Sequence, residues 1–359
     1  TIRSHISSWL NWTPRAQLEG QGMEQPDDAS QGGPPDWQET DDSGSETEDE
    51  PDLWKSRPRR YGHSIRRDKP PKHIRVMLQN LQRLPIHGRA DRSTQFMANI
   101  RDHRPDIVLL NDVGLCWKNI PTHHQWQERS RTELPPHKSM FSYNKHGSNS
   151  TKVQWGGTGM LLFDEARHRT VGSFGADPEN LGRWTWARIQ GREGHHVRVV
   201  SAYKPCKNQQ NEGSSYQQQL LYFRSKEDFN CPLKLFDTHL KQQLQEWLTE
   251  GEHIVLGLDM NKDARTGDTA KMLLEIGLTD AIIKLHRPAI PPETNYKNSQ
   301  GRPIDAIFTT PSMAPVEGGY MPYKAFMDSD YCTLWIDIPF TSFLGHNFPH
   351  VHPRKPMTV

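Results

Sequence analysis

This sequence of 359 residues has few cysteines, no long apolar run and almost no net charge. Its four cysteines are widely spaced and follow no secretory signal, which favours free thiols in a reducing compartment over a disulfide framework. No apolar stretch approaches the roughly 20 residues of a membrane helix, so we expect no membrane partner. The sequence therefore predicts an intracellular protein.

Charge is balanced overall but segregated near the start of the chain. Lys and Arg number 44 against 43 Asp and Glu, so a preference for nucleic acid must come from local clusters. Residues 39–52 carry eight acidic side chains and no basic one, whereas residues 55–75 carry nine basic ones. We interpret the basic cluster as an arm that contacts phosphate, with a solvated linker or a nuclear-targeting patch as the alternative. The arginines assigned to nucleic-acid binding here are Arg59, Arg60, Arg66 and Arg67.

Composition divides the chain into three segments. Residues 1–73 are rich in Gln, Gly, Pro, Asp, Glu and Ser, and we expect them to be mostly disordered. Residues 74–340 have the texture of one folded domain, and residues 341–359 form a Pro- and His-rich extension. Because the chain begins at Thr1 and stops in that extension, we expect it to be a piece of a longer protein.

The central segment alternates predicted strands and helices. Residues 74–80 read as a strand, 92–104 as a helix with one apolar face, and 106–110 as a buried strand. Strand, helix, strand indicates a βα unit inside a layered α/β domain. The further predicted strands are 159–163, 184–189, 197–202, 304–309 and 333–338, and the further predicted helices are 235–250 and 270–276.

Acidic and amide side chains gather at the ends of these strands. The apolar run 253–257 leads into Leu258-Asp259-Met260-Asn261, and Asn80 and Asp112 lie at or just past the ends of two other strands. An isolated Asp at a strand end is usually a turn or cap residue. Several together, with Asp305 and Asp330, form a set of hard oxygen ligands without His or Cys. Such ligands suit Mg²⁺ or Mn²⁺ and phosphoester chemistry.

Seven short motifs in order give the chain a specific resemblance. They are Gln79-Asn80, residues 106–112, 156–159, 201–205, 258–261, 303–307 and 329–331. Across about residues 74–339 the chain resembles the endonuclease/exonuclease/phosphatase superfamily, which includes deoxyribonuclease I, abasic-site endonucleases and the endonuclease domains of non-LTR retrotransposons. The resemblance implies an α/β fold, a four-layered sandwich of two mainly antiparallel β-sheets flanked by helices.

The resemblance also implies roles for individual residues. The implied metal ligands, for Mg²⁺ or Mn²⁺, are Asp112, Asn80 and Asp330. The implied catalytic residues are Asp259, Asn261, Tyr203, Asp305 and Tyr331. Asp259 would orient or deprotonate the attacking water, and Asn261 and Tyr203 would bind the scissile phosphate. For Tyr203 alone, a packed sheet residue is nearly as good an interpretation, and a tight turn explains residues 156–159 more simply than a phosphate cradle.

Four positions in three of the motifs depart from the superfamily pattern. Tyr331 stands where the superfamily has His, and a phenol with a pKa near ~10 cannot supply the positive charge of an imidazolium at neutral pH. Asp112 replaces Glu and Asn111 replaces Gln, which shortens both side chains by one methylene. Leu258 replaces Gly. We expect activity to be weakened or lost through the first two changes.

The resemblance is strongest to retroelement endonucleases, which supports three expectations. First, the chain nicks DNA and is followed by a reverse transcriptase in a nuclear protein. Second, Arg183, between Gly182 and Trp184, is a candidate for stacking on bases, although a place in the strand core is the preferred interpretation of this stretch. Third, two other functions compete with DNA nicking. One is a degenerate module that binds nucleic acid or protein, and the other, less favoured, is an inositol-phosphate phosphatase.

Overall fold

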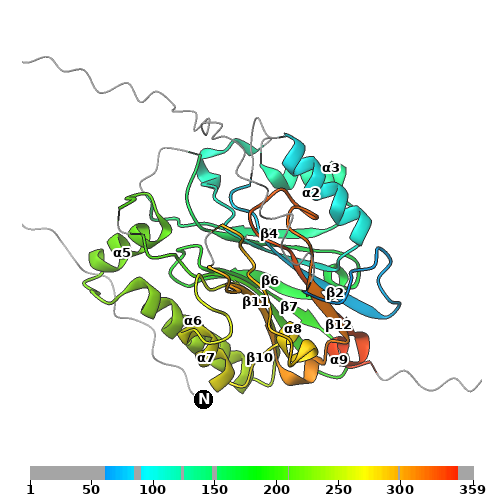
Figure 1. Cartoon of the computed structure of the whole chain (residues 1–359). Helices are drawn as coiled ribbons and strands as arrows, with labels where there is room; N and C mark the ends of the chain where they lie inside the picture. The colour runs from blue at the N-terminus through cyan, green and yellow to red at the C-terminus, as the bar shows by residue number, and fades with distance from the viewer. Residues whose placement is uncertain are drawn as a thin grey trace, which may run out of the picture. The chain divides into compact units, whose positions relative to one another are not determined.

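Two β-sheets face each other in the computed structural model (Figure 1). The structure describes residues 61–84, 90–122, 125–147, 152–208, 210–297 and 300–346. Each sheet has one parallel pair of strands near its centre and antiparallel pairs elsewhere, as predicted. None of the helices in these ranges is long and apolar enough to cross a membrane.

The first sheet has seven strands and contains the predicted βα unit. In spatial order they are β1 (Tyr61–Gly62), β12 (Glu317–Tyr320), β13 (Leu334–Pro339), β2 (His73–Asn80), β3 (Ile107–Asn111), β5 (Thr158–Leu162) and β4 (Lys138–Ser142). Strands β2 and β3 are parallel, and α2 (Ala90–His103) connects them. Both strands are almost entirely buried, which explains the apolar run of β3 and the apolar centre of β2 at residues 76–78.

The second sheet has six strands and is built on the same plan. In spatial order they are β10 (Thr279–Asp280), β11 (Asp305–Thr309), β9 (His253–Asp259), β8 (His196–Tyr203), β7 (Trp184–Gln190) and β6 (Thr170–Ala176). Strands β8 and β9 are parallel, and α5 (Ser215–Ser225) and α6 (Pro232–Thr249) connect them. Helix α6 begins at Pro232, whose fixed φ suits a first helical turn, and buries Phe236, Leu240 and Leu244 on one face.

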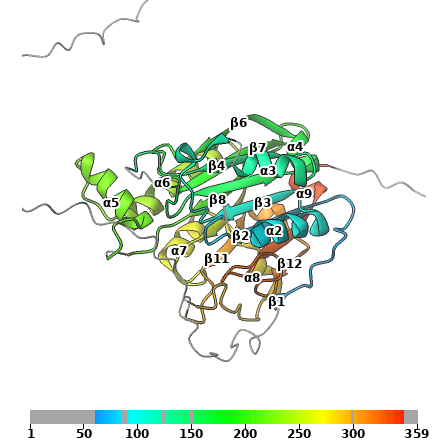
Figure 2. The same ribbon diagram turned by 90° about the horizontal axis from the view of Figure 1, so that it is seen from above.

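Helices cover the outer faces of both sheets, so the molecule has four layers (Figures 1 and 2). Helices α2 and α3 (Trp126–Glu133) pack on the first sheet through Phe96, Met97 and Trp126. Helices α6 and α7 (Asp268–Glu275) pack on the second sheet. The remaining elements are α4 (Asp164–His168), α8 (Ala281–His286), α9 (Phe340–Leu344) and two 3₁₀ turns, η1 (Trp117–Asn119) and η3 (Pro311–Met313). The predicted four-layered sandwich is confirmed.

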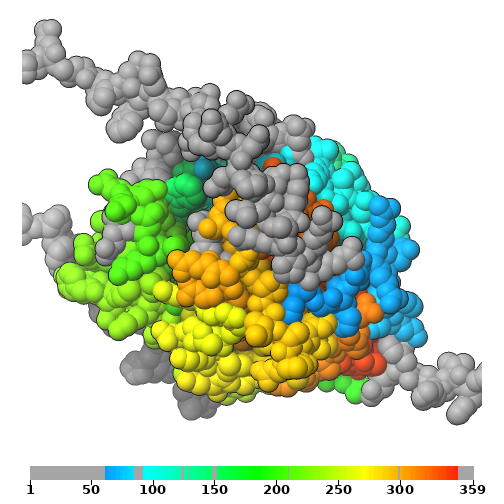
Figure 3. All heavy atoms as spheres, in the orientation of Figure 1, coloured from blue at the N-terminus to red at the C-terminus, as the bar shows by residue number. Residues whose placement is uncertain are grey.

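The inner faces of the sheets approach closely at Gly257 on β9. A Cβ atom there would lie 2.6 Å from Cδ1 of Leu109 and 3.0 Å from Cδ1 of Leu78, both in the first sheet. Only a residue without a side chain allows this separation. Figure 3, in the orientation of Figure 1, shows a face of the molecule on which a yellow-to-orange segment lies between a green segment and the blue segment after Tyr61.

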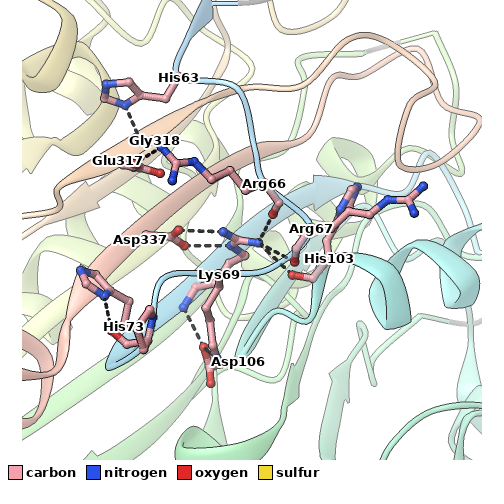
Figure 4. Close-up of polar contacts among 12 residues, drawn as sticks. His63, Arg66, Arg67, Lys69, His73, His103, Asp106, Glu317, Gly318 and Asp337 are labelled. Atoms are coloured by element: carbon pink, nitrogen blue, oxygen red, sulfur yellow. Dashed lines mark hydrogen bonds and ion pairs between the residues drawn. The ribbon is translucent and has the colours of Figure 1, made fainter.

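The predicted boundary at residue 73 is wrong for residues 61–73. Tyr61–Gly62 forms β1 and pairs with β12. The buried guanidinium of Arg75 donates to both carboxylate oxygens of Asp337, and also to the carbonyls of Arg66 and His103 (Figure 4). These contacts tie the segment to β2 and β13. At the other end, α9 continues the fold to residue 344. Residues 1–60, including Arg59 and Arg60, and residues 347–359 lie outside the described part of the chain.

Candidate active site

The strand ends bring the predicted residues of both sheets together. Asn80 ends β2 in the first sheet, and Asp259 ends β9 in the second. Nδ2 of Asn80 donates to Oδ2 of Asp259 at 2.8 Å, which joins the two sheets directly. Within the second sheet the register places Tyr203 and Asp305 opposite Asp259 on its two neighbouring strands. The site therefore forms where four separately predicted segments meet.

Asp259 is fully buried and hydrogen-bonded on both oxygens. Its Oδ1 accepts from the backbone N–H of Asn261 at 2.8 Å, and its Oδ2 accepts from Asn80. Burial, and then the charge of Asp305, raise the pKa of Asp259 well above its ordinary value. A carboxylate held in this way is poised to take up a proton, and its orientation is fixed.

Asp305 is the second buried carboxylate of this group. Its Oδ2 accepts from the hydroxyl of Thr294 at 2.6 Å, whereas its buried Oδ1 has no partner among the described residues. Burial raises the pKa of Asp305 to about 7, against the opposing hydrogen bond from Thr294. Two adjacent buried carboxylates, one with an unsatisfied oxygen, disfavour full ionisation unless a cation or donor compensates.

Tyr331 lies beside these carboxylates at the position where the resemblance implies His. Burial, and then the charges of Asp259 and Asp305, raise the pKa of its phenol far above the usual value. The phenol is therefore neutral at physiological pH and can serve only as a hydrogen-bonding group.

Asp112 follows β3 with a left-handed backbone, φ 48°. Its Oδ1 accepts from the backbone N–H of Gly156 at 2.9 Å, so the predicted turn at residues 156–159 orients this carboxylate. Burial raises the pKa of Asp112 to about 6, while the Gly156 N–H and the charge of Arg83 oppose the rise. Its second oxygen makes no hydrogen bond within the described residues.

Asp330 is held by three donors from two loops. Its Oδ2 accepts from the amide of Gln82 at 2.7 Å and lies 3.3 Å from Nζ of Lys297, and its Oδ1 accepts from the phenol of Tyr296 at 2.7 Å. Burial raises its pKa, but these donors outweigh burial and the net pKa is lowered. A metal ion at Asp330 would have to displace at least one of them.

Asn261 and Tyr203 face the same space from the second sheet. Asn261 has φ 49°, and its Nδ2 donates to the carbonyl of Lys204 at 2.7 Å. The Lys204 ammonium is in turn buried against Asp237 and Thr269, at 2.6 and 2.8 Å. Tyr203 is half-buried next to Gly156, and burial, followed by the charges of Asp112 and Asp259, raises its pKa well above the ordinary value. Helices α6 and α7 thus hold Asn261 indirectly, through Lys204.

A cavity of about 440 Å³ opens over this group. Of the predicted residues, Asp112, Tyr203, Asn261 and Tyr331 line it. Its other lining residues are Trp155, Cys206, Asn208, Asn211, Ser214, Ser215, Lys262, Asp263, Arg302 and Ile304. The cavity therefore combines polar and apolar surface, with three aromatic side chains and two basic residues on its walls.

A Mg²⁺ or Mn²⁺ ion fits the chemistry of this donor set. No three His, Cys, Asp or Glu side chains in the described ranges are grouped closely enough to hold a metal by themselves. Mg²⁺ is commonly bound through one or two carboxylates, with water and substrate phosphate completing its octahedron. Asp112, with one oxygen free of hydrogen bonds to the described residues, could serve as that carboxylate.

The assignment of Arg183 to nucleic-acid binding is wrong. Arg183 is 1% exposed, its guanidinium donates to both oxygens of Asp177 at 2.8 and 2.6 Å, and it packs over Trp184. It is a core residue, which was the preferred interpretation of this stretch. A buried guanidinium paired in this way cannot reach a base.

Arg66 and Arg67 lie far from the cavity. Their carbonyls contact Arg75 near the start of β2, whereas Asn80 ends that strand. Arg75 lies five positions before Asn80 on this strand, and each position advances the chain by about 3.3 Å. The side chain of Arg66 is exposed and lies 3.6 Å from Glu317. These two arginines belong to the opposite end of the sheet.

Sequence reasoning missed Gln82, Lys204 and Trp155. Gln82 connects two predicted residues, because its backbone N–H donates to Oδ1 of Asn80 while its amide donates to Asp330. The sequence feature that could have identified Gln82 is its position two residues after Asn80. Trp155 precedes the glycine turn and is 38% exposed, with the guanidinium of Arg83 over its ring at 4.7 Å. An exposed Trp beside a predicted site was the available signal.

Comparisons with solved structures give similar folds at low sequence identity. The chain is similar to AP endonuclease LMAP from Leishmania major, with TM-score 0.54, 14% identity and coverage of 81% of this chain and 96% of that chain. It is similar to the human Nocturnin catalytic domain, with TM-score 0.52, 16% identity and coverage of 78% and 98%. The APE2 catalytic domain of Xenopus laevis gives TM-score 0.52, 13% identity and coverage of 74% and 92%.

Sequence comparisons add nothing to this. No protein-family model matches the chain. No curated protein matches it either. The structural likeness, together with the two facing mixed sheets and their flanking helices, establishes the architecture. The chain folds as a DNase I-like α/β sandwich, the fold of these AP endonucleases and of the Nocturnin catalytic domain.

Proposed function

We propose that the chain is a phosphodiesterase dependent on Mg²⁺ or Mn²⁺, and that it nicks DNA. One observation carries the proposal: Asn80 and Asp259, from different sheets, are joined at 2.8 Å beside Asp305 and below the cavity. This grouping is what water activation next to a phosphate requires. Similar solved structures are named AP endonucleases, which supports the choice of DNA as substrate.

Asp259 would orient the attacking water and accept its proton. Burial, and then the carboxylate of Asp305 beside it, raise the pKa of Asp259, which makes its ionised form a stronger base. Asn261 and Tyr203 would hold the phosphate, and Asp112 with Asn80 would hold the cation. When bound, the cation supplies positive charge for the phosphate and the leaving oxygen.

Tyr331 limits the expected rate. A neutral phenol donates a hydrogen bond to the phosphate but cannot serve as a cationic acid. Loss of a positioned acid or base typically lowers a rate on the order of 10² to 10⁴-fold. We therefore expect slow cleavage by the natural sequence.

Trp155 supports a nucleic-acid substrate. It lines the cavity and is partly exposed, and Arg83 packs over its ring. Aromatic side chains on a cavity wall stack on bases of any sequence, at about 1 to 3 kcal/mol for each base. A small phosphorylated metabolite would make less use of such a surface.

The second candidate is a binding module without catalysis. The observations that favour it are the neutral Tyr331 and the engagement of both oxygens of Asp330 by donors. In that case the cavity would hold DNA or a protein segment without cleaving it.

The wider setting that we propose follows from the sequence motifs. The chain would be the endonuclease part of a retroelement protein, with a reverse transcriptase beyond residue 359, acting in the nucleus. DNA nicking by this chain is necessary for that setting but does not by itself identify it. Cleavage of target DNA coupled to primer extension by the full-length protein would test it.

A plasmid-nicking assay with Mg²⁺ or Mn²⁺ tests the proposed activity. We expect slow nicking by the natural chain, none by Asp259→Ala, and faster nicking by Tyr331→His. Glu275→Ala, at an exposed residue of α7, is the matched control and should nick like the natural chain. Silence of the natural chain with gain of activity in Tyr331→His would favour the binding module. Silence of both would reject cleavage.

A further inference from the structure

We propose that Lys262 is the residue that binds the anionic phosphate in this cavity, an inference that rests on the proposed function. Lys262 directly follows Asn261 and lines the cavity together with Asp112 and Tyr331. It is exposed, and it makes no ion pair or side-chain hydrogen bond within the described residues.

The neighbouring charges explain why this ammonium is left unpaired. Asp263, the next residue, is already engaged on both oxygens by Arg265, at 2.9 and 2.8 Å. The adjacent Cys206 gives no anion, because burial raises the pKa of its thiol. Lys262 therefore has no internal counter-ion close to it.

The other basic side chains near the site are already engaged. Lys204 is buried against Asp237, and Lys297 lies 3.3 Å from Asp330. Arg302, which also lines the cavity, donates to Gln300 at 2.6 Å. Lys262 is thus the cavity-lining cation that can contact a phosphate without losing an existing contact.

The backbone beside Lys262 is fixed. Asn261 is anchored twice, by its N–H to Asp259 at 2.8 Å and by its Nδ2 to the carbonyl of Lys204 at 2.7 Å. The lysine stem starts from this anchored residue at the cavity wall. The carboxylates below repel an anion, so an ammonium at the wall supplies the attraction that the neutral Tyr331 cannot.

Salt-dependent binding tests the role independently of cleavage. The affinity of a short fluorescein-labelled duplex is measured by anisotropy in EDTA over a range of NaCl concentrations. A lysine that contacts one phosphate contributes about 0.9 to the slope of log K against log salt. We expect Lys262→Ala to bind several-fold more weakly and to lose about that much slope. Lys262→Arg should keep both values near those of the natural chain.

The control is Lys271→Ala, an exposed lysine of α7 outside the cavity, which should leave affinity and slope unchanged. Competition by inorganic phosphate distinguishes a site for free phosphate from one for the DNA backbone: only the former is blocked by phosphate in the millimolar range. An unchanged slope in Lys262→Ala would overturn the inference.

The outcomes for Lys262 and for the proposed activity are separable. Binding that depends on Lys262 without any nicking leaves this inference standing while the proposed cleavage fails. Nicking with a natural slope and an unchanged KM in Lys262→Ala removes the inference alone. Absence of both nicking and binding removes both.

Discussion

At the scale of single residues, the chemistry of the site is dominated by buried carboxylates with raised pKa values. Asp259 and Asp305 are held on adjacent strands where neither is fully compensated. Sequence reasoning identified both, and also Asn80 and Asp112, because each ends or starts an apolar strand. It could not identify Gln82 or Lys204, because their roles arise from contacts with loops distant in sequence.

The carboxylates make stability depend on pH, and Asp305 provides the test. Its folded pKa, about 7, lies above its ordinary value, so the folded state holds the proton more tightly than the unfolded state. The associated stability is complete below about pH 4 and is lost as the pH rises through about 7. We expect unfolding free energy, measured by urea in EDTA, to fall between pH 5 and 8, by an amount on the order of 2 to 4 kcal/mol. Asp305→Asn should flatten this dependence. If the unfolding free energies of Asp305→Asn and of the natural chain changed in parallel with pH, the prediction would be contradicted.

Arg183 is predicted to stabilise the fold without contributing to DNA binding. Removing one partner of a buried ion pair costs about 3 to 5 kcal/mol, because Asp177 would be left as a buried, unpaired charge. Arg183→Ala should lower the urea midpoint accordingly, while Arg224→Ala, an exposed arginine of α5, should not. DNA affinity of the folded Arg183→Ala protein should equal that of the natural chain. A selective loss of affinity would restore the base-stacking interpretation.

At the scale of elements, the apolar pattern predicted the central strands but missed strands at or next to the edges of the sheets. The predicted segments 74–80, 106–110 and 197–202 match β2, β3 and β8 within one to two residues. Strands β6 and β12 were missed, because β6 is only partly buried and β12 contains two glycines. Such strands depend on their neighbours for hydrogen bonds rather than on their own side chains. Residues 61–73 were assigned to disorder for the same reason.

The ion pair between Arg75 and Asp337 holds residues 61–69 against the first sheet, through the carbonyls of Arg66 and Arg67. Arg75→Met should destabilise the protein by about 3 to 5 kcal/mol through the unpaired carboxylate. Arg75→Met combined with Asp337→Leu should regain most of this stability, because both charges are removed. In both variants the carbonyls of Arg66 and Arg67 lose their donor, so hydrogen exchange should speed up over residues 61–69. Unchanged exchange in the double variant would show that β1 pairing alone holds the segment.

At the scale of the whole molecule, ligand and stability are linked through the carboxylates. A cation that binds only the folded state stabilises it, more so where the carboxylates are ionised. We expect 10 mM Mg²⁺ to raise Tm more at pH 8 than at pH 5.5, by several degrees. Asp112→Asn should reduce the rise. An equal rise at both pH values, or one that persists in Asp112→Asn, would place the cation elsewhere.

The contact at Gly257 sets the distance between the sheets, and Gly257→Ala tests its importance. Overpacking of a core typically costs about 1 to 3 kcal/mol. A methyl group there would push against Leu109 and Leu78 and so widen the separation of the sheets. The rate of nicking should then fall by a larger fraction than the free energy of unfolding does. Ala187→Gly, a change of similar size on β7, is the control for stability alone.

The bond between Asn80 and Asp259 has a consequence for how this protein could be regulated or evolve. The candidate site takes Asn80 from the first sheet and Asp259 from the second, so neither sheet carries the complete set of residues by itself. A partner, a temperature change or a distant substitution that moves the two sheets apart by a fraction of an ångström would abolish the proposed nicking before the chain unfolds. The rate of the proposed nicking should therefore respond to the fit between the two sheets more sensitively than the stability of the fold does.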